Sequence, residues 1–480
     1  MSHFSRRRVL STGAAGLAAS AIPLTLFGEM GAEAGPPLVR YEASTPNGQA
    51  MLTKYSQAVA IMKSKALGDP CSWTFQANTH WVRSDTTKAA LVATLPAAQQ
   101  PLANDMWNTC QNHGGLTTED MFLPWHRMYV YYLEKIVRMV LNDNTFTLPY
   151  WNYNAAATAA MPNKFINPGN AGNPLYRAQR NAGPQSGAPL TGLDLSALGQ
   201  TTYSGFCSTL DFGLHGNVHV KVGNGQGMGA VPWAANDPIF WMHHCNIDRL
   251  WASWNAAGRT NPTTASWLNQ TFVFANPGYA GCTKIVATVG NFKAIAPLGY
   301  AYDRLEPVPG ALHIKWPFLL LESVRPFLLK GPGPVELSPG ATHVQLATAG
   351  LESVPQKGPL LSTRLKALTA DKRIYLLLDG LMADSQPGVT YSVYLNPPGA
   401  SPNAPDKSLR VGTINFFGAV MPGGGRMKDP PKQAFDVTDL LRGLERKGPL
   451  SDKVSVSVVP DGEADAKARP MVGSLSLAEV

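Results

Sequence analysis

Seven of the ten histidines lie in short motifs whose residue types and spacing could bind metal ions. The motif HGNVH places His215 and His219 four residues apart, which puts both rings on one face of a helix. The segment NDPIFWMHHCNIDRLWASW carries the adjacent pair His243 and His244. Three more histidines lie upstream in QANTHW, CQNHGG and FLPWHR: His80, His113 and His126. The pattern predicts two clusters of three histidines each.

The ligand types favour copper over other metals. Magnesium and calcium prefer oxygen ligands, and a structural zinc site normally recruits cysteine thiolates, whereas imidazole binds zinc, copper, iron and nickel. Ligation by histidine without a carboxylate therefore favours copper. A zinc hydrolase built on HGNVH is the alternative metal enzyme, but the motif lacks the glutamate that acts as general base in HExxH. Metal analysis would decide between these two classes.

The adjacent pair lies in a segment that is typical of a buried helix. Asp237 can cap the first backbone N–H groups, and Pro238 suits the first helical position, so a helix is predicted to begin here. His244 and Asp248 share a face one turn apart, which predicts a carboxylate beside one imidazole. A second helix is predicted from Pro124 to Asn142, directly around His126, and apolar spacing predicts another over 50–65. Facing helices of a bundle can hold a two-metal centre.

FLPWHR, HxxxH and NDPIFWMHHxNIDRLW together resemble the signatures of the type 3 copper family, the tyrosinases, catechol oxidases and plant-type polyphenol oxidases. The resemblance implies a mainly α catalytic domain, a four-helix bundle that holds two copper ions and uses dioxygen as co-substrate. It implies these ligands for the first copper: His80, His113 and His126. It implies these for the second: His215, His219 and His244. Metal content of single variants would show whether His243 or His244 is the ligand.

The chain departs from the family pattern around His113. His113 lies thirteen residues before His126, which is longer than the family's usual interval, and GGLTTED resembles a loop insertion. In plant and fungal members a cysteine forms a thioether with the second histidine of the first site. Ser84 stands at the plant position, and Cys110 lies three residues before His113 rather than the two of fungal members. A thioether at Cys110 is left open.

Three further positions bear on the substrate. In the family, a water held by a glutamate and an asparagine near the second site has been proposed to deprotonate monophenols. Asp211 stands at the glutamate position and Gly216 at the asparagine position, so both anchors are weakened, while the small Val231 matches the gate position. The resemblance therefore implies strong oxidation of o-diphenols to o-quinones and weak monophenol hydroxylation. The alternative is that Gly216 suits a tight helix start and Asp211 caps it.

Other functions use the same kind of centre. A true tyrosinase or an o-aminophenol oxidase would share these motifs, and hemocyanin-like oxygen binding is the non-enzymatic alternative. Colour formation with a catechol separates an enzyme from an oxygen carrier. The expected partner is a small phenolic substrate. The formal charge of +8 is scattered along the chain, which does not indicate a nucleic-acid surface.

A chain of 480 residues exceeds what one hydrophobic core usually supports, so two domains are expected. The copper domain is predicted over 35–305, a Pro/Gly-rich linker over 306–365, and an all-β sandwich over 366–480. The sandwich rests on RIYLLLDGL, VTYSVYLN, RVGTINFFG and KVSVSVVP, which are separated by turn residues. YSVYLNPP and VSVSVVP resemble the C-terminal domain of plant-type members, which in relatives can cover the copper site.

The N-terminus resembles an export signal. Residues 1–34 combine twin arginines, an apolar run and a small-residue cleavage pattern, so export by the twin-arginine machinery to the periplasm or the exterior is expected. No later apolar run approaches about 20 residues, and the mature chain is expected to have no membrane anchor. Five cysteines cannot all pair, and the sequence does not give the pairing.

Overall fold

The computed structural model describes residues 36–111, 120–166, 172–279, 281–309, 327–348, 360–369, 372–396, 406–420 and 430–480. His113 and the predicted export signal lie outside these residues. The chain from Pro37 to Val480 forms one unit. Among the described residues, no helix combines the length and apolar character needed to cross a membrane.

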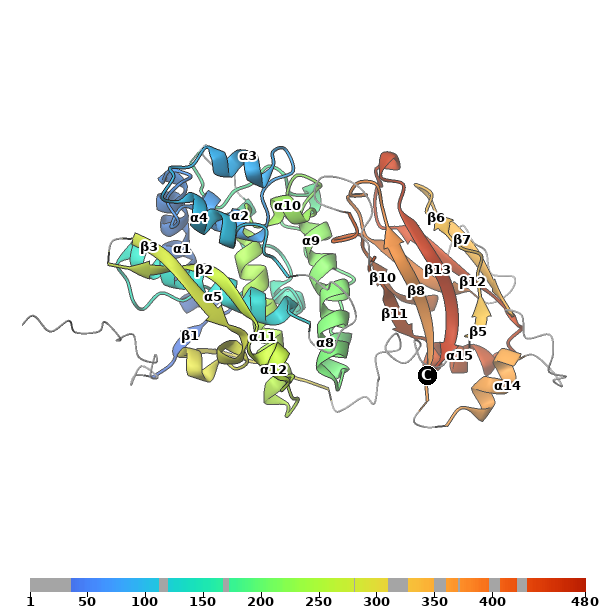
Figure 1. Ribbon diagram of the computed structural model, residues 1–480. Helices are drawn as coiled ribbons and strands as arrows, with labels where there is room; N and C mark the ends of the chain where they lie inside the picture. Colours follow the sequence, from blue (N-terminus) through green and yellow to red (C-terminus); the bar gives the residue numbers. More distant parts are fainter. Residues whose placement is uncertain are drawn as a thin grey trace, which may run out of the picture. The chain divides into compact units, whose positions relative to one another are not determined.

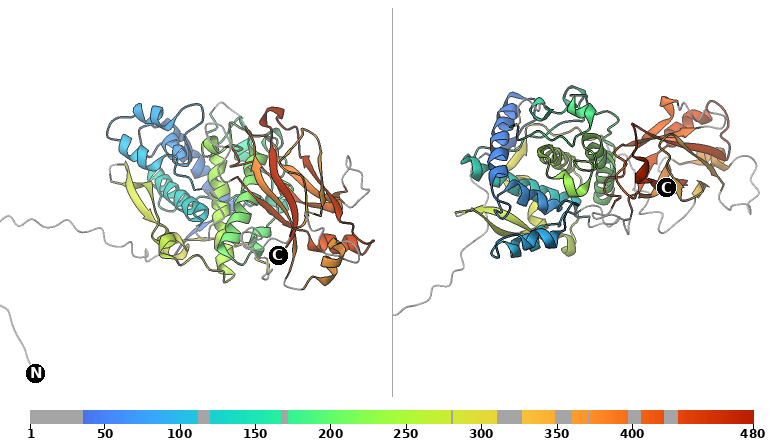
Figure 2. Two further views of the ribbon diagram at one scale, coloured as in Figure 1. Left: turned by 45° about the vertical axis from the view of Figure 1, so that its right-hand side comes forward. Right: turned by 90° about the horizontal axis from the view of Figure 1, so that it is seen from above.

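Long helices form the centre of the N-terminal domain. Helices α5 (Phe122–Leu141) and α11 (Pro238–Ala256) lie side by side, and α1 (Pro46–Ser64) packs against α5 (Figures 1 and 2). Shorter helices complete the domain: α2 (Trp73–His80), α3 (Lys88–Ala93), α4 (Gln100–Met106), α8 (Tyr203–Thr209), α9 (Gly216–Val222) and α10 (Val231–Ala234). A helical copper domain was predicted, and this part of the fold is confirmed.

Helix α11 begins where the sequence predicted. The Asp237 carboxylate accepts a hydrogen bond from the Ile239 N–H, and Pro238 occupies the first helical position. Arg180 donates to both carboxylate oxygens of Asp237, at 2.9 and 2.6 Å, which fixes the cap. Helix α5 ends at Asn142, which adopts a left-handed conformation as a C-cap.

The partners of Asp248 among the described residues are not histidines, which differs from the predicted carboxylate beside an imidazole. Asp248 instead accepts hydrogen bonds from four buried groups: Arg40, Arg127, Tyr300 and Tyr302. Burial alone would raise the pKa of Asp248, but Arg127 and Arg40 hold it below its ordinary value. Because strand β1 (Leu38–Arg40) pairs with β4 (Tyr300–Tyr302), the two ends of the domain meet at α11 and stabilise it.

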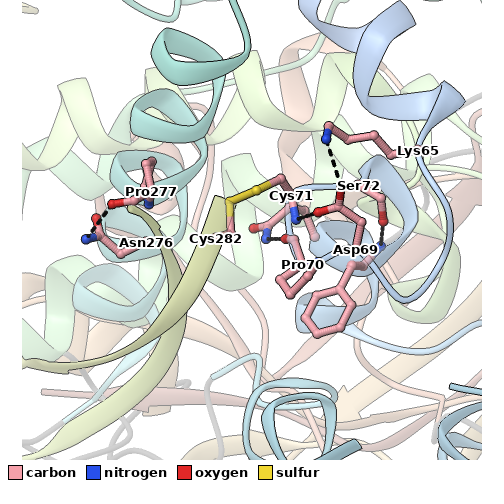
Figure 3. The surroundings of a disulfide bond; sticks show 10 residues. Lys65, Asp69, Pro70, Cys71, Ser72, Asn276, Pro277 and Cys282 are labelled. Atoms are coloured by element: carbon pink, nitrogen blue, oxygen red, sulfur yellow. Dashed lines mark hydrogen bonds and ion pairs between the residues drawn. A yellow bond between two sulfur atoms is a disulfide. The ribbon is translucent and has the colours of Figure 1, made fainter. Parts of the chain in front are cut away.

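A disulfide ties the first helices to a hairpin. Cys71, which lies just before α2, is bonded to Cys282 of β3 (Gly281–Thr288), which pairs with β2 (Thr271–Gly278) (Figure 3). Asp69 accepts a hydrogen bond from the Cys71 N–H at 2.7 Å and pairs with Lys65 at 2.8 Å (Figure 3). The remaining cysteines, Cys110, Cys207 and Cys245, are free.

The C-terminal domain is all β apart from two short helices, as predicted. Its nine strands form one hydrogen-bonded sheet in the order β10-β9-β12-β7-β5-β13-β8-β11, with β6 paired to β13. The strands are β5 (Phe327–Lys330), β6 (Val335–Glu336), β7 (Thr342–Ala347), β8 (Ile374–Met382), β9 (Tyr391–Asn396), β10 (Arg410–Ile414), β11 (Gln433–Asp436), β12 (Lys453–Pro460) and β13 (Met471–Glu479). The helices are α14 (Leu360–Ala367) and α15 (Thr438–Glu445).

Two features of this domain differ from the sequence expectation. The sheet curls until its first and last strands meet, because Gly412 of β10 leaves room for the Phe435 ring of β11. Strands β5 to β7 belong to the sheet, although a linker was predicted over 306–365. Proline and glycine residues around these strands made the segment resemble a linker. Strand β7 pairs with β12, which is far away in the sequence, so local residues do not indicate the strand.

Candidate metal centre

Four histidines from three elements converge on one point. His215 ends a π-helical segment (Leu210–His215), His219 lies on α9, and His243 and His244 lie on α11. All four are buried, and ligand atoms of the four rings lie within 4.8 Å of one another. The predicted second cluster is therefore assembled from segments about 30 residues apart in sequence.

The other group of candidate ligands, at the predicted first copper site, contains a thiol. His80, from the end of α2, and His126, from the first turn of α5, lie with Cys110 so that their ligand atoms are within 4.8 Å of one another. Cys110 Sγ is 3.6 Å from His126 Nε2. Burial raises the pKa of the Cys110 thiol well above its ordinary value. The sequence analysis considered Cys110 only for a thioether, not as a neighbour of His126.

Backbone carbonyls set the orientation of three rings. The Nδ1 atom of His80 lies 3.0 Å from the Val231 carbonyl oxygen, that of His126 is 2.8 Å from Phe122 O, and that of His219 is 2.8 Å from Met228 O. A carbonyl accepts only from an N–H, so each ring carries its proton on Nδ1 and leaves the Nε2 lone pair for a metal. Backbone carbonyls, and not Asp248, are therefore the acceptors that orient these three rings.

Asp211 lies beside the ring of His215. The His215 Nδ1 atom is 2.8 Å from the Asp211 carboxylate and 3.3 Å from its backbone oxygen. The π-helical segment brings the two residues, four apart in sequence, into this contact. The structure therefore brings Asp211 into the second cluster, where its carboxylate faces a ligand ring instead of capping a helix.

His243 and His244 have different surroundings, although they are adjacent in the sequence. His243 Nδ1 lies 2.9 Å from the Tyr153 hydroxyl. Both ring nitrogens of His244 lack a hydrogen-bond partner among the described residues, and its ring stacks on His126 with a centroid distance of 4.2 Å and an angle of 7°. A buried imidazole with two bare nitrogens, lying between the two groups of ligands, is suited to bind a metal.

The site favours neutral imidazoles. Burial lowers the pKa of His80 to about 3 and lowers the pKa of His126, His219 and His244 well below the ordinary value. Neighbouring rings lower the pKa of these last three further. Only a neutral imidazole has a lone pair for a metal, so the site is prepared for cations without first losing protons.

Aromatic side chains surround the histidines. Phe122 lies 4.7 Å from both His126 and His215, and Phe240 lies 4.2 Å from His244, measured between ring centroids. Trp125 contacts His126 at 4.7 Å. Trp241 packs on Trp73, Tyr129 and Phe240 and belongs to the hydrophobic core.

The C-terminal domain reaches the second cluster. The Phe417 ring stacks on His219 with a centroid distance of 4.0 Å and an angle of 12°, and lies 5.4 Å from His215. Phe417 also packs with Val231 and Val220. Val231 lines a groove of about 940 Å³ together with residues of the C-terminal domain. The sequence analysis missed Phe417, since RVGTINFFG is typical of any buried strand.

Gly216 is in contact with the same domain. A Cβ atom at position 216 would lie 2.5 Å from Asn415 Oδ1 and 2.8 Å from Asn415 Nδ2. The absence of a side chain at Gly216 therefore admits the Asn415 amide. Because this contact joins residues about 200 apart in sequence, no local pattern could have indicated it.

Comparison with known proteins agrees with this architecture. The family described as the common central domain of tyrosinase matches residues 70–196 and 188–257, and a domain of unknown function, DUF7868, matches residues 332–479. The chain is 30% identical to tyrosinase HcTyr1 of Hahella sp. (strain CCB-MM4), over 89% of this chain and 96% of that protein. It is 26% identical to the chloroplastic polyphenol oxidase of Malus domestica, over 86% and 73%. The structure of latent apple tyrosinase has a TM-score of 0.56 at 21% identity and covers 93% of this chain and 98% of that one.

The match to the tyrosinase family model and to tyrosinase and polyphenol oxidase relatives, together with two groups of potential metal ligands, makes the chain a type 3 copper oxidoreductase. The chain belongs to the tyrosinase family. It is a copper-dependent enzyme whose cofactor is a pair of copper ions and whose reaction is the oxidation of phenols. The histidine clusters fit this cofactor, since four buried rings present Nε2 atoms that no described group satisfies: those of His215, His219, His243 and His244.

Proposed function

We propose that this chain oxidises o-diphenols to o-quinones with dioxygen and hydroxylates monophenols weakly. The observation that carries the proposal is the position of Asp211 and Gly216 at the second cluster. The Asp211 carboxylate is engaged with His215 Nδ1 at 2.8 Å, and Gly216 offers no side chain that could hold a water. Oxidation of a diphenol needs electron removal, whereas hydroxylation of a monophenol first needs a base near the metal.

We propose three histidine ligands for each copper. Those of the first are His80, His113 and His126, and those of the second are His215, His219 and His244. The choice of His244 within the adjacent pair follows the motif of the family. His244 has two ring nitrogens without a described partner, whereas His243 has one, its Nε2. Bound copper would supply the redox chemistry through which electrons of the phenol pass to dioxygen. The chain holds the rings through the carbonyls of Val231, Phe122 and Met228, and Phe122 and Phe240 exclude water.

The experiment is oxygen uptake by the copper-loaded enzyme on a catechol and on the matching monophenol. We expect rapid uptake with the catechol and slow uptake with the monophenol. Comparable rates would favour a true tyrosinase, and a preference for o-aminophenols would favour an aminophenol oxidase. Binding of oxygen without consumption of either phenol would favour the hemocyanin-like alternative.

We propose that the C-terminal domain holds the enzyme latent. Phe417 packs on His219 and beside Val231, the gate position, so it occupies the space through which a phenol ring would approach the second copper. Cutting the chain within 307–359 should raise turnover if the domain leaves. Equal rates for the intact and cut forms would reject latency.

We also propose that the protein is exported through the twin-arginine pathway. The charged, apolar and small-residue parts of residues 1–34 follow the order of such a signal. The disulfide between Cys71 and Cys282 supports an oxidising compartment. Replacing Arg6 and Arg7 by Lys should leave the protein inside the cell, as fractionation would show.

A further inference from the structure

The π-helical segment Leu210–His215 presents a backbone carbonyl to the C-terminal domain. Asn415 Nδ2 donates to Phe212 O at 2.7 Å, and Gln433 Nε2 donates to the same oxygen at 2.5 Å. In a π-helix the hydrogen bonds span five residues rather than four, which breaks the regular pairing of neighbouring carbonyls. Phe212 lies three residues before His215, so these two amides act on the turn that carries a histidine of the second cluster.

The Asn415 amide is fully used in this position. Its Nδ2 also donates to Asn217 Oδ1 at 3.0 Å, and its Oδ1 accepts from the Phe417 N–H at 3.0 Å. Asn415 is 3% exposed and Gln433 is 5% exposed, so neither amide exchanges these partners for water. Gly216, directly after His215, leaves the space that Asn415 fills. One amide thus links the π-helical turn, α9 and the Phe417 backbone.

The first group of ligands is held differently. His80 and His126 are oriented by carbonyls of Val231 and Phe122, both of the helical domain. The His215 Nδ1 atom lies 3.3 Å from Asp211 O, farther than the Nδ1-to-carbonyl distances of the three rings that carbonyls orient, and its other neighbour is the Asp211 carboxylate of the same turn. The orientation of His215 therefore depends on how firmly the π-helical turn itself is held.

We propose that Asn415 and Gln433 are positioning residues for the second copper, and that they act by clamping the Phe212 carbonyl of the turn that presents His215. The C-terminal domain is then a structural part of the second half of the centre as well as its cover. The inference rests on the proposed role of His215 as a copper ligand. It predicts that loss of the clamp loosens the second copper and leaves the first copper unchanged.

The test measures release of copper to a chelator from the full-length protein. Two backgrounds separate the half-sites: His126→Ala retains the second, and His244→Ala retains the first. In each background we compare Asn415→Ala, Gln433→Ala and the double variant. Because either amide alone can satisfy the Phe212 carbonyl, we expect a small effect of each single change and a release of the second copper about tenfold faster in the double variant. Release of the first copper should not change.

Lys221→Met is the matched control. Lys221 of α9 donates to Thr390 Oγ1 at 3.1 Å and lies 3.8 Å from Asp461, so the variant removes another contact between the same domains without touching the Phe212 carbonyl. Equal acceleration by Lys221→Met would show that general loosening of the domains is sufficient and would overturn the inference. A further comparison is made in the Gln433→Ala background. If Asn415→Gln retains the second copper longer than Asn415→Ala does, the clamp is supported.

The outcomes distinguish this inference from the proposed function. If the wild-type protein binds two coppers and the double variant releases the second copper at the wild-type rate, only the clamp is contradicted. Wild-type protein that does not bind a second copper contradicts the ligand assignment. If the double variant does not fold, the two single variants decide: each should release the second copper about twofold faster than wild type, and release at the wild-type rate in both contradicts the clamp.

Discussion

The two halves of the copper centre use the same side chain but depend on different parts of the chain. In the first half, α2 and α5 carry His80 and His126, and carbonyls of the same domain orient the rings. In the second half, a π-helical turn, α9 and α11 carry the histidines. Phe417 of the C-terminal domain stacks on His219, and Asn415 bonds the Phe212 carbonyl of the π-helical turn. The two halves therefore use the same type of proposed ligand, but substrate access and ring orientation at each half depend on its own surroundings.

The largest effect should come from the second-half ligands. We expect His244→Ala to lose the second copper and nearly all activity, because neither of its buried ring nitrogens has a described protein partner, while His243→Ala keeps two coppers. Copper content of the two purified variants is the measurement. A filled second site in His244→Ala together with an empty one in His243→Ala would reverse the assignment.

Removal of the Phe417 ring should have the next largest effect. Phe417→Ala keeps the C-terminal domain but opens the space over His219, so we expect turnover of a catechol to rise about tenfold if the covered state limits access. Steady-state rates of wild type and variant test this. The control variant is Tyr394→Phe, which changes an aromatic residue of strand β9 in the same domain. Phe416→Ala is not used, because Phe416 belongs to the core of the β domain. No change in turnover would mean that Phe417 packs on the site without limiting it.

The disulfide between Cys71 and Cys282 offers a test of the first half of the centre, since Cys71 lies just before α2. Cys71→Ala with Cys282→Ala opens a loop of 211 residues, and we expect a loss of about 2–5 kcal/mol of unfolding free energy. The ratio of the two coppers should stay at one to one, since neither cysteine touches a histidine. Chemical unfolding and copper analysis measure the two quantities. Selective loss of the first copper would show that the disulfide also positions α2.

Gly216→Asn should produce a smaller change, one that depends on the C-terminal domain. We expect it to raise the ratio of monophenol to diphenol activity by a few-fold, because an amide at this position could help to hold a water. In the intact protein the new side chain collides with Asn415, so the rise should be clearer after cleavage within 307–359. Both activities, measured on intact and cut enzyme, give the ratio. An unchanged ratio in the cut form would contradict the water-base argument.

The smallest effect concerns Cys110. The thiol lies 3.6 Å from His126 and is free in the structure, so denatured, unreduced protein should titrate as three thiols: Cys110, Cys207 and Cys245. Cys110→Ser should lower the number to two and leave the copper content near that of wild type. Two thiols in the wild-type protein would reveal a thioether at the first half-site.

The sequence by itself predicted the two long helices that begin near Pro124 and Pro238 and the histidines proposed as ligands. Asp237 and Pro238 marked the start of α11, and Asn142 marked the end of α5, because capping depends on residues that are neighbours in the chain. Histidine spacing predicted the clustering of five proposed ligands, His80, His126, His215, His219 and His244, because an i, i+4 pair and strong motifs carry their own geometry. His113 lies outside the described residues, and its role stays a prediction.

Only the tertiary structure decided what surrounds those ligands. Asp248 shares a helical face with His244, yet two buried arginines from distant segments attract its charge more strongly than a neutral ring can. The carbonyls of Val231, at the start of α10, and of Met228, in the turn before it, became ring acceptors through a chain path that no side-chain pattern records. Asn415 and Phe417 reach the second half-site across about 200 residues, because a folded β domain brings one turn to Gly216 and His219. Contacts of this kind depend on how whole domains pack, and local sequence contains no record of that packing.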